Sequence, residues 1–199
     1  MSSSSPTASS ATKTPHWLLI LILATMSTLG PFAIDTYLPS FHAIETDLNA
    51  SSFQLQQTLS FFLGASGFMG LFHGALSDSF GRRKVVLTGL VVFAIASVGC
   101  ALSTSIGGLL FFRAMQGLSS GVGMIVGRAI IRDTQSGAEA QRMMSMVTMI
   151  FGFAPAVAPI IGGYLHTAFG WHSVFWFITG FSLFVWLLSL LYLPESLPL

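Results

Sequence analysis

Apolar residues fall into six long runs along the chain, separated by short polar or charged segments. The runs cover 17–38, 53–76, 85–102, 106–131, 143–165 and 173–193. Each is near or above the ~20 residues that an α-helix needs to cross a ~30 Å hydrocarbon core. The pattern predicts an all-α membrane protein with a six-helix transmembrane bundle over 16–199. The first run exceeds the ~7–15-residue core of a signal peptide, so we expect it to be a retained helix.

The segment before the first run has a different composition. Residues 1–15 are rich in Ser, Thr and Ala and contain a single Lys. Such a segment cannot bury enough apolar surface to offset the entropy of folding. We therefore predict that 1–15 is a disordered tail on the cytoplasmic side.

Composition excludes several classes of protein. Hydrophobic residues make up 53% of the chain and charged residues only 8%, whereas soluble domains carry about 25% charged residues. Eight basic and seven acidic residues nearly cancel, so the basic face that nucleic-acid binding requires is missing. The single cysteine, Cys100, provides neither a disulfide framework nor a paired-cysteine metal site. We expect no metal and no cofactor.

The basic residues predict the orientation of the helices. They occur before the first run and around the connections between alternate pairs of runs, at Lys13, Arg82, Arg83, Lys84, Arg128, Arg132 and Arg142. The intervening segments 39–52, 103–105 and 166–172 contain no Lys or Arg. Basic residues favour the cytoplasmic side of a membrane. We therefore expect a multi-pass protein of the cell (inner) membrane with both termini in the cytoplasm.

Besides Arg128 near the end of the fourth run, two charges lie inside apolar runs, Asp35 in the first and Arg113 in the fourth. A charge at the bilayer centre costs ~2.5–3.5 kcal/mol even on lenient scales, so such residues normally face the bundle interior. A rise of 1.5 Å per residue puts both in the outer half of the bilayer, where they could meet directly or through water. One interpretation is a structural ion pair, or an Asp at a helix end. The other is a protonatable carboxylate for proton coupling, with Gln116 and Gly117 on the Arg113 face of the helix.

Glycines and prolines are concentrated in three of the runs. G-x-x-x-G pairs, which allow helices to approach closely, occur at Gly70/Gly74, Gly117/Gly121 and Gly123/Gly127. The fifth run contains Pro155 and Pro159, followed by Gly162 and Gly163. Proline interrupts the hydrogen-bond ladder of a helix, so we predict a bent fifth helix that packs against a neighbour.

Several motifs resemble those of one transporter family. The segment from Gly74 through Asp78 and Gly81 to Lys84 resembles the G-x-L-x-D-x-x-G-R-[RK] motif of the major facilitator superfamily, and Arg113-Ala-Met-Gln116-Gly117 resembles its fourth-helix motif. The stretch from Ala154 to Gly163 is similar to the antiporter motif of drug:proton antiporters. Five further segments resemble the Bcr/CflA group of drug-resistance exporters: Asp35–Pro39, Arg132-Asp133, Arg142–Met146, Trp171–Trp176 and Leu193–Ser196.

The resemblance implies roles for these residues. Gly74, Asp78, Gly81, Arg82 and Arg83 would form a cytoplasmic latch, although the three consecutive basic residues also determine topology. Asp35 and Arg113 would serve proton coupling beside the substrate cavity. The antiporter-motif residues Pro155, Pro159, Gly162 and Gly163 would shape the fifth helix where two halves of the transporter meet.

The family fold has two six-helix halves with substrate between them, and this sequence accounts for the N-terminal half. We therefore expect a second half as partner, from a homodimer or a separate chain, together with the lipid bilayer, protons and a small amphipathic substrate. The predicted function is proton-coupled multidrug efflux. Alternatives are export of a metabolite such as an amino acid or nucleoside, and a non-transporting fragment or assembly module. No enzyme motif is present.

Overall fold

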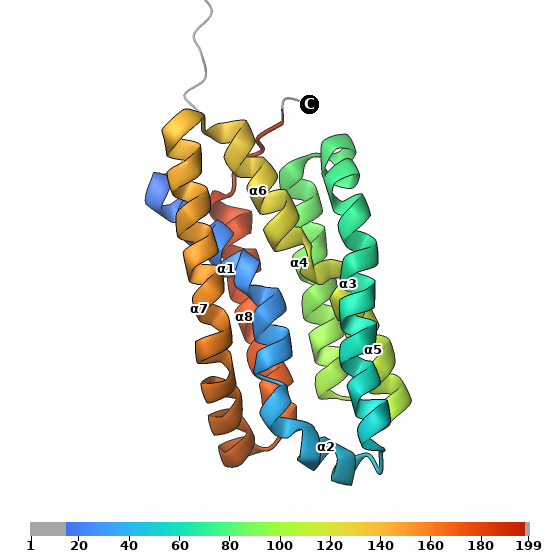
Figure 1. Cartoon of the computed structure of the whole chain (residues 1–199). Coiled ribbons are helices and arrows are strands. Elements are labelled where there is room, and N and C mark those ends of the chain that lie inside the picture. Colours follow the sequence, from blue (N-terminus) through green and yellow to red (C-terminus); the bar gives the residue numbers. More distant parts are fainter. Residues whose placement is uncertain (1–14, 198–199) are drawn as a thin grey trace, which may run out of the picture.

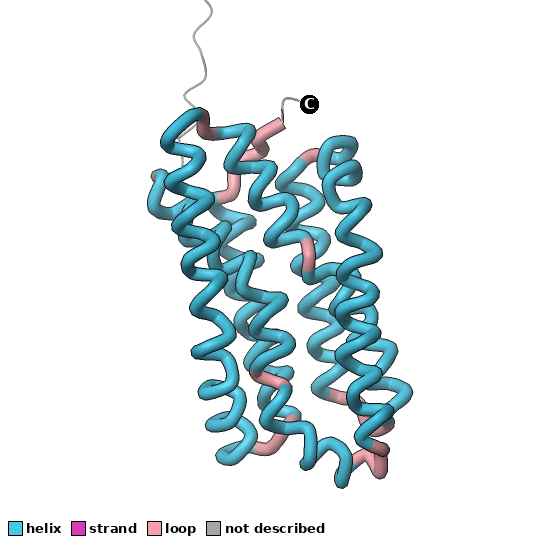
Figure 2. Tube along the Cα trace, in the orientation of Figure 1, coloured by secondary structure: helices cyan, strands magenta, loops and turns pink. Residues whose placement is uncertain are grey.

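The computed structural model describes residues 15–197, which form helices and short turns without any strand (Figure 1; Figure 2). Six segments are long and apolar enough to cross a membrane: His16–Asp47, Ser52–Phe80, Arg82–Ala101, Ile106–Thr134, Gly137–Phe169 and His172–Tyr192. The six predicted spans and the all-helical fold class are thereby confirmed. The predicted tail lies outside the described residues apart from Pro15.

Two of the six spans contain interruptions. The first consists of α1 (His16–Asp35), a 3₁₀ turn (Leu38–Ser40) and the short helix α2 (Phe41–Asp47), so the segment after Pro39 is largely helical. The fourth is divided at Gly121 into α5 (Ile106–Ser120) and α6 (Val122–Thr134). The remaining spans are single helices: α3 (Ser52–Phe80), α4 (Arg82–Ala101), α7 (Gly137–Phe169) and α8 (His172–Tyr192).

Local sequence explains where the helices begin and turn. Helix α3 starts with a capping box, in which Gln54 N donates to Ser51 Oγ (3.2 Å) and Ser51 N donates to Gln54 Oε1 (3.0 Å). Gly81 has φ +93°, a conformation that glycine adopts without steric cost. This one-residue turn sends α4 back alongside α3.

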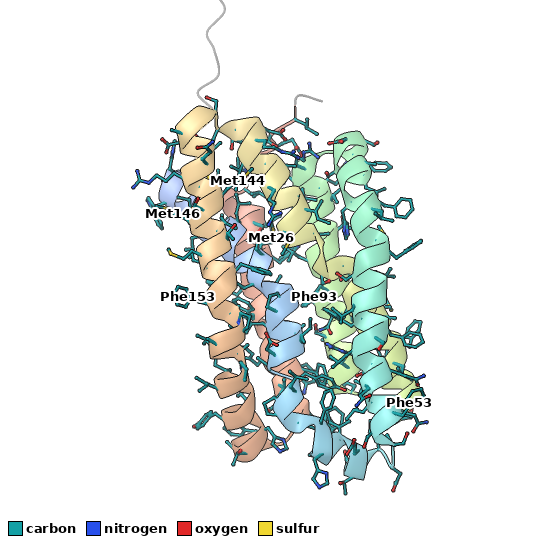
Figure 3. All side chains as sticks on the ribbon, viewed as in Figure 1. Met26, Phe53, Phe93, Met144, Met146 and Phe153 are labelled. Atoms are coloured by element: carbon teal, nitrogen blue, oxygen red, sulfur yellow. The ribbon has the colours of Figure 1, made fainter. Side chains whose placement is uncertain are left out.

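The helices form one bundle with α1 near its centre. Helix α1 packs against α6, α7 and α8, while α3 packs on α5, and α4 packs on α5 and α8. Met26 and Phe93 lie in the interior, and Phe53 and Phe153 lie on the outer faces (Figure 3). Large apolar side chains such as Phe153 (63% exposed) face outward on every span, as a surrounding bilayer permits. The chain is a multi-pass membrane protein.

Charged residues gather at one end of the bundle, where α3 turns into α4, α6 turns into α7 and α8 ends (Figure 1). We call this the basic end and define it by five residues: Arg82, Arg83, Lys84, Arg132 and Arg142. At the opposite end, Trp171 Nε1 donates to Asp47 Oδ2 at 3.0 Å and ties α2 to the start of α8.

Candidate functional site

A cavity of about 390 Å³ lies among α1, α3, the α5–α6 junction and α7. Its walls are mostly apolar and include Phe62 of α3, Met124 of α6 and Phe151 of α7. The polar lining comes from hydroxyl groups and one carboxylate, at Ser27, Ser66, Ser120 and Asp35. Its size falls within the ~300–1,000 Å³ of ligand pockets, which combine apolar walls with a few polar groups.

Asp35 supplies the charge in this cavity. It is the last residue of α1 and is partly exposed. Within residues 15–197 its carboxylate has no hydrogen-bond or ion-pair partner. A carboxylate in apolar surroundings is costly unless it is paired or protonated, so this group is poised to accept a proton or a cation.

By the depth estimate Arg113 could meet Asp35, and the structure gives its guanidinium other direct partners. The guanidinium is fully buried, and its Nη1 donates to the carbonyl oxygen of Ala33 (2.9 Å) and to Gln116 Oε1 (2.7 Å). Arg113 therefore reaches α1 two residues before Asp35. Two residues correspond to about 200° around a helix, so the Asp35 side chain leaves α1 on another face. The depth estimate thus agrees with contact between Arg113 and this stretch of α1, and the direct acceptor there is the Ala33 carbonyl.

Aromatic rings separate Arg113 from the cavity. Its guanidinium carbon lies 4.5 Å from the ring centre of Phe62 and 4.8 Å from that of Tyr37, and such cation–π contacts stabilise a desolvated cation. Phe62 also lines the cavity, whereas Arg113 does not. The basic group therefore lies one layer behind the wall that carries Asp35.

Gln116 and Gly117 also lie behind the wall. Gln116 Nε2 donates to Ser97 Oγ at 2.8 Å, which extends the Arg113 network from α1 through α5 to α4. A methyl group added at Gly117 would lie 3.0 Å from Cα of Phe62, so this glycine allows α5 to contact the α3 backbone. Of the predicted set, Asp35 lines the cavity. Arg113, Gln116 and Gly117 are buried behind the cavity wall and support the packing of the helices.

Prolines remove helical hydrogen bonds at the cavity. Proline has no N–H and cannot donate to the carbonyl four residues earlier, so Pro31 leaves the carbonyl of Ser27 without its helical donor. Pro155 does the same for Phe151, and all four residues line the cavity. Helix α7 continues through Pro155 and Pro159 without a break. Two helices that line the cavity therefore each carry a backbone carbonyl without its helical donor.

Adjacent glycines of α7 differ in their surroundings. A methyl group at Gly162 would lie 2.6 Å from Cα of Thr36, so Gly162 allows α7 to pack on the end of α1. No atom lies within 4 Å of the corresponding position at Gly163. Gly162 therefore serves packing within this bundle, and Gly163 leaves an open surface.

The predicted latch residues form a network at the basic end. Arg82 is buried and forms ion pairs with Asp78 and, through Nε at 3.0 Å, with Asp133 Oδ2. The Glu195 carboxylate accepts from the backbone N–H groups of Arg82 (2.9 Å) and Arg83 (3.2 Å). An anion at a helix N-terminus is stabilising, so the segment after α8 caps α4. Gly74 has no atom within 4 Å of an added methyl group.

Among the site residues absent from the predicted set are Pro31, Asp133 and Glu195. Pro31 is visible in the sequence as a proline inside the first apolar run. Asp133 and Glu195 occur in the segments that resemble drug exporters, yet only the fold shows that both contact the turn after α3. Pairing of residues so far apart in the chain leaves no local pattern.

Comparisons with known proteins agree with this fold. Residues 15–199 match the Major Facilitator Superfamily. A bicyclomycin resistance protein homolog of Haemophilus influenzae is 37% identical over 180 residues, which are 90% of this chain and 45% of that protein. The multidrug resistance protein MdtL of Escherichia coli is 36% identical over 170 residues, covering 85% of this chain and 44% of the relative. The chain spans about half the length of these relatives.

Among solved structures, the proton:xylose symporter XylE aligns with a TM-score of 0.81 at 16% identity, over 91% of this chain and 45% of XylE. The family and these relatives are transporters or resistance proteins rather than enzymes. Family, fold and named relatives agree with the resemblance seen in the sequence motifs. The chain belongs to the major facilitator superfamily.

Proposed function

We propose that this six-helix bundle is one half of a proton-coupled exporter of small amphipathic drugs. The names of its relatives, a bicyclomycin resistance protein homolog and a multidrug resistance protein, support drug efflux. The apolar cavity with aromatic walls supports an amphipathic substrate. The basic end faces the cytoplasm in this proposal, following the positive-inside bias, and the bundle resides in the cell (inner) membrane.

The observation that carries the proposal is the unpaired Asp35 carboxylate in the cavity wall. A carboxylate already neutralised by Arg113 would have little reason to bind a proton. Because Arg113 is engaged by Ala33 and Gln116, Asp35 is free to exchange a proton against substrate. In its protonated form the carboxyl group becomes a hydrogen-bond donor, which changes both the charge and the hydrogen bonding of the cavity.

A second six-helix half completes the cavity in this proposal. Helices α3 and α7 are the least buried of the six spans. Both expose glycines with no neighbouring atom within 4 Å, among them Gly67 and Gly74 of α3 and Gly152 and Gly163 of α7. Small residues on apolar helices allow another helix to approach closely. In detergent, a particle of two chains supports a homodimer, and a strict monomer supports a half from a separate chain.

The network at the basic end acts as the latch. Asp78 and Asp133 approach Arg82 from α3 and α6, so the charges join three helices at the end we assign to the cytoplasm. Release of these ion pairs would allow the basic end to open toward the cytoplasm, and their formation would hold it closed.

The test is drug uptake into proteoliposomes that contain the purified chain. With an acidic lumen, protons leaving through the protein should drive radiolabelled bicyclomycin inward. We expect Asp35→Asn to reduce this uptake at least tenfold. The matched control is Asp47→Asn, which makes the same chemical change outside the cavity, keeps an amide oxygen that can accept from Trp171, and should transport normally. Amino acids and nucleosides serve as alternative substrates in parallel assays.

Two results would overturn the proposal. The first is an absence of bicyclomycin flux under every gradient from purified chain that forms the two-chain particle, which would favour a non-transporting module. The second is uptake that Asp35→Asn leaves unchanged, which would remove the carboxylate from the coupling step.

A further inference from the structure

A second cavity, of about 400 Å³, lies among α3, α4 and the α5–α6 junction and shares no lining residue with the cavity at Asp35. Its lining is largely apolar and includes Met69, Leu76, Phe80, Val92 and Leu118. Two basic side chains complete it, His73 and Lys84. Neither belongs to the proposed transport site or to the latch.

His73 is the unexplained polar group of this cavity. The residue is only 2% exposed, and its Nδ1 is buried without a hydrogen-bond partner in the part of the chain that the structure describes. A buried nitrogen without a hydrogen-bond partner is destabilising. A methyl group at Gly121 would lie 3.2 Å from this Nδ1, so the glycine leaves room for the imidazole. The ring is thus held in the cavity wall with one nitrogen unsatisfied.

Lys84 stands where the cavity reaches the basic end. Its side chain is exposed, and its ammonium has no ion pair within residues 15–197. The neighbouring carboxylates are already engaged, since Asp78 and Asp133 contact Arg82 and Glu195 caps α4. The cavity mouth therefore carries one uncompensated positive charge.

The lining residues extend from this charge into the depth of the bundle. Val92 follows Lys84 by eight residues on α4, which is about 12 Å at 1.5 Å per residue. That distance covers much of one leaflet of a ~30 Å hydrocarbon core. His73 lies seven residues before the end of α3, between the charged mouth and the apolar interior. Along the cavity the cation lies at the mouth and the hydrogen-bonding ring lies deeper, and apolar side chains line the wall at both levels.

We propose that this cavity binds one anionic glycerophospholipid. The phosphate lies against Lys84, an ester carbonyl accepts a hydrogen bond from His73, and one acyl chain occupies the apolar part. A glycerophospholipid carries its groups in this order, with ester carbonyls directly below the phosphate and alkyl chains beyond them. Basic pockets between transmembrane helices are recognised sites for lipid headgroups.

The first test is native mass spectrometry of the full chain titrated with phosphatidylglycerol or phosphatidylcholine of identical chains. We expect phosphatidylglycerol to be retained preferentially, and Lys84→Gln to weaken its binding about fivefold, as ~1 kcal/mol per basic residue implies. Arg132→Gln is the matched control, because it removes an exposed cation of the basic end that lies outside the cavity. The affinity of this variant for phosphatidylglycerol should stay within twofold of wild type.

The second test isolates His73. A diether phosphatidylglycerol keeps the phosphate and alkyl chains but lacks the ester carbonyls. Wild-type protein should prefer the diester lipid, and His73→Phe should bind both lipids equally. Each variant is first compared with wild type by size-exclusion retention, and His73→Leu, which also lacks a hydrogen-bond donor, replaces the Phe variant if that one misfolds.

Three results would overturn the proposal. Equal binding of phosphatidylglycerol and phosphatidylcholine would remove the role of charge. Unchanged binding by Lys84→Gln would place the lipid elsewhere. Displacement of phosphatidylglycerol by a free fatty acid at equal concentration would show that the cavity binds any alkyl chain without recognising the phospholipid headgroup.

Discussion

The buried guanidinium of Arg113 donates to the backbone carbonyl of Ala33 at 2.9 Å, only two residues before Asp35. The same Nη1 donates to Gln116, and Gln116 donates to Ser97. This chain of hydrogen bonds fixes the end of α1 against α5 and α4 without contacting the Asp35 carboxylate. Arg113 and Gln116 therefore stabilise the end of α1, whereas Asp35 supplies the charge in the cavity. Substitutions at these positions should affect stability and transport separately.

Gln116→Leu should destabilise the bundle. It removes an acceptor from the buried Arg113 and a donor from Ser97, and an unsatisfied buried charged group costs about 1–3 kcal/mol or more. We expect a lower melting temperature in detergent, measured by intrinsic tryptophan fluorescence. Gln56→Leu makes the same change at an exposed position of α3 and should melt like wild type. Equal melting of the two variants would contradict the support role.

Gly162→Ala and Gly163→Ala should have opposite effects although the positions are adjacent. The added methyl group at position 162 meets the Thr36 backbone, which cannot move aside as a side chain can, and overpacking of this kind costs about 1–3 kcal/mol. At position 163 the methyl group meets no atom within 4 Å, and Ala should stabilise the helix by roughly 0.5–1 kcal/mol. Thermal unfolding followed by size-exclusion recovery measures both, and a stable Gly162→Ala variant would refute the close contact.

Asp133→Asn should weaken the basic end more than Asp78→Asn does. The Asp133 side chain is 23% exposed and accepts from both Arg82 and Ser196, whereas that of Asp78 is 61% exposed. Exposed ion pairs contribute at most about 1 kcal/mol. Amide hydrogen exchange over residues 82–90 should therefore rise more in Asp133→Asn. Faster exchange in the Asp78 variant would reverse this order of importance.

Pro155→Ala should reduce transport without lowering stability. Alanine restores an N–H that can donate to the carbonyl of Phe151, so the cavity loses a free acceptor while the helix gains a hydrogen bond. We expect a melting temperature at or above that of wild type and slower bicyclomycin uptake in the proteoliposome assay. Pro39→Ala, in the 3₁₀ turn outside the cavity, is the control. Unchanged uptake in the Pro155 variant would show that the acceptor is not used.

The helices themselves were predictable because a bilayer leaves few alternatives. Runs of about 20 apolar residues are required for crossing, and each of the six appears as a helix at nearly the expected place. The helical continuation after Pro39 was not expected, because the polar residues of 41–47 resemble a loop in sequence. A tertiary hydrogen bond stabilises this short helix, because Asp47 accepts from Trp171 at the start of a distant span.

Individual partners were less predictable than helices. The depth of Arg113 followed from counting residues, whereas its choice of the Ala33 carbonyl over Asp35 depends on the rotation of α1 about its axis. That rotation is set by packing, including the close contact of Gly123 with the Met26 backbone. The latch residues Asp78 and Arg82 are four positions apart and could be paired from sequence, but Asp133 and Glu195 join them only through the fold.

The two prolines at the cavity have a consequence for how its specificity can change over generations. The carbonyls of Ser27 and Phe151 belong to the main chain, so exchange of a lining side chain alters the shape of the cavity but leaves these acceptors in place. A family of descendants can therefore acquire new substrates by substituting Phe62, Met124 or Ile125 while inheriting the same hydrogen-bonding positions. Only replacement of Pro31 or Pro155 would erase them.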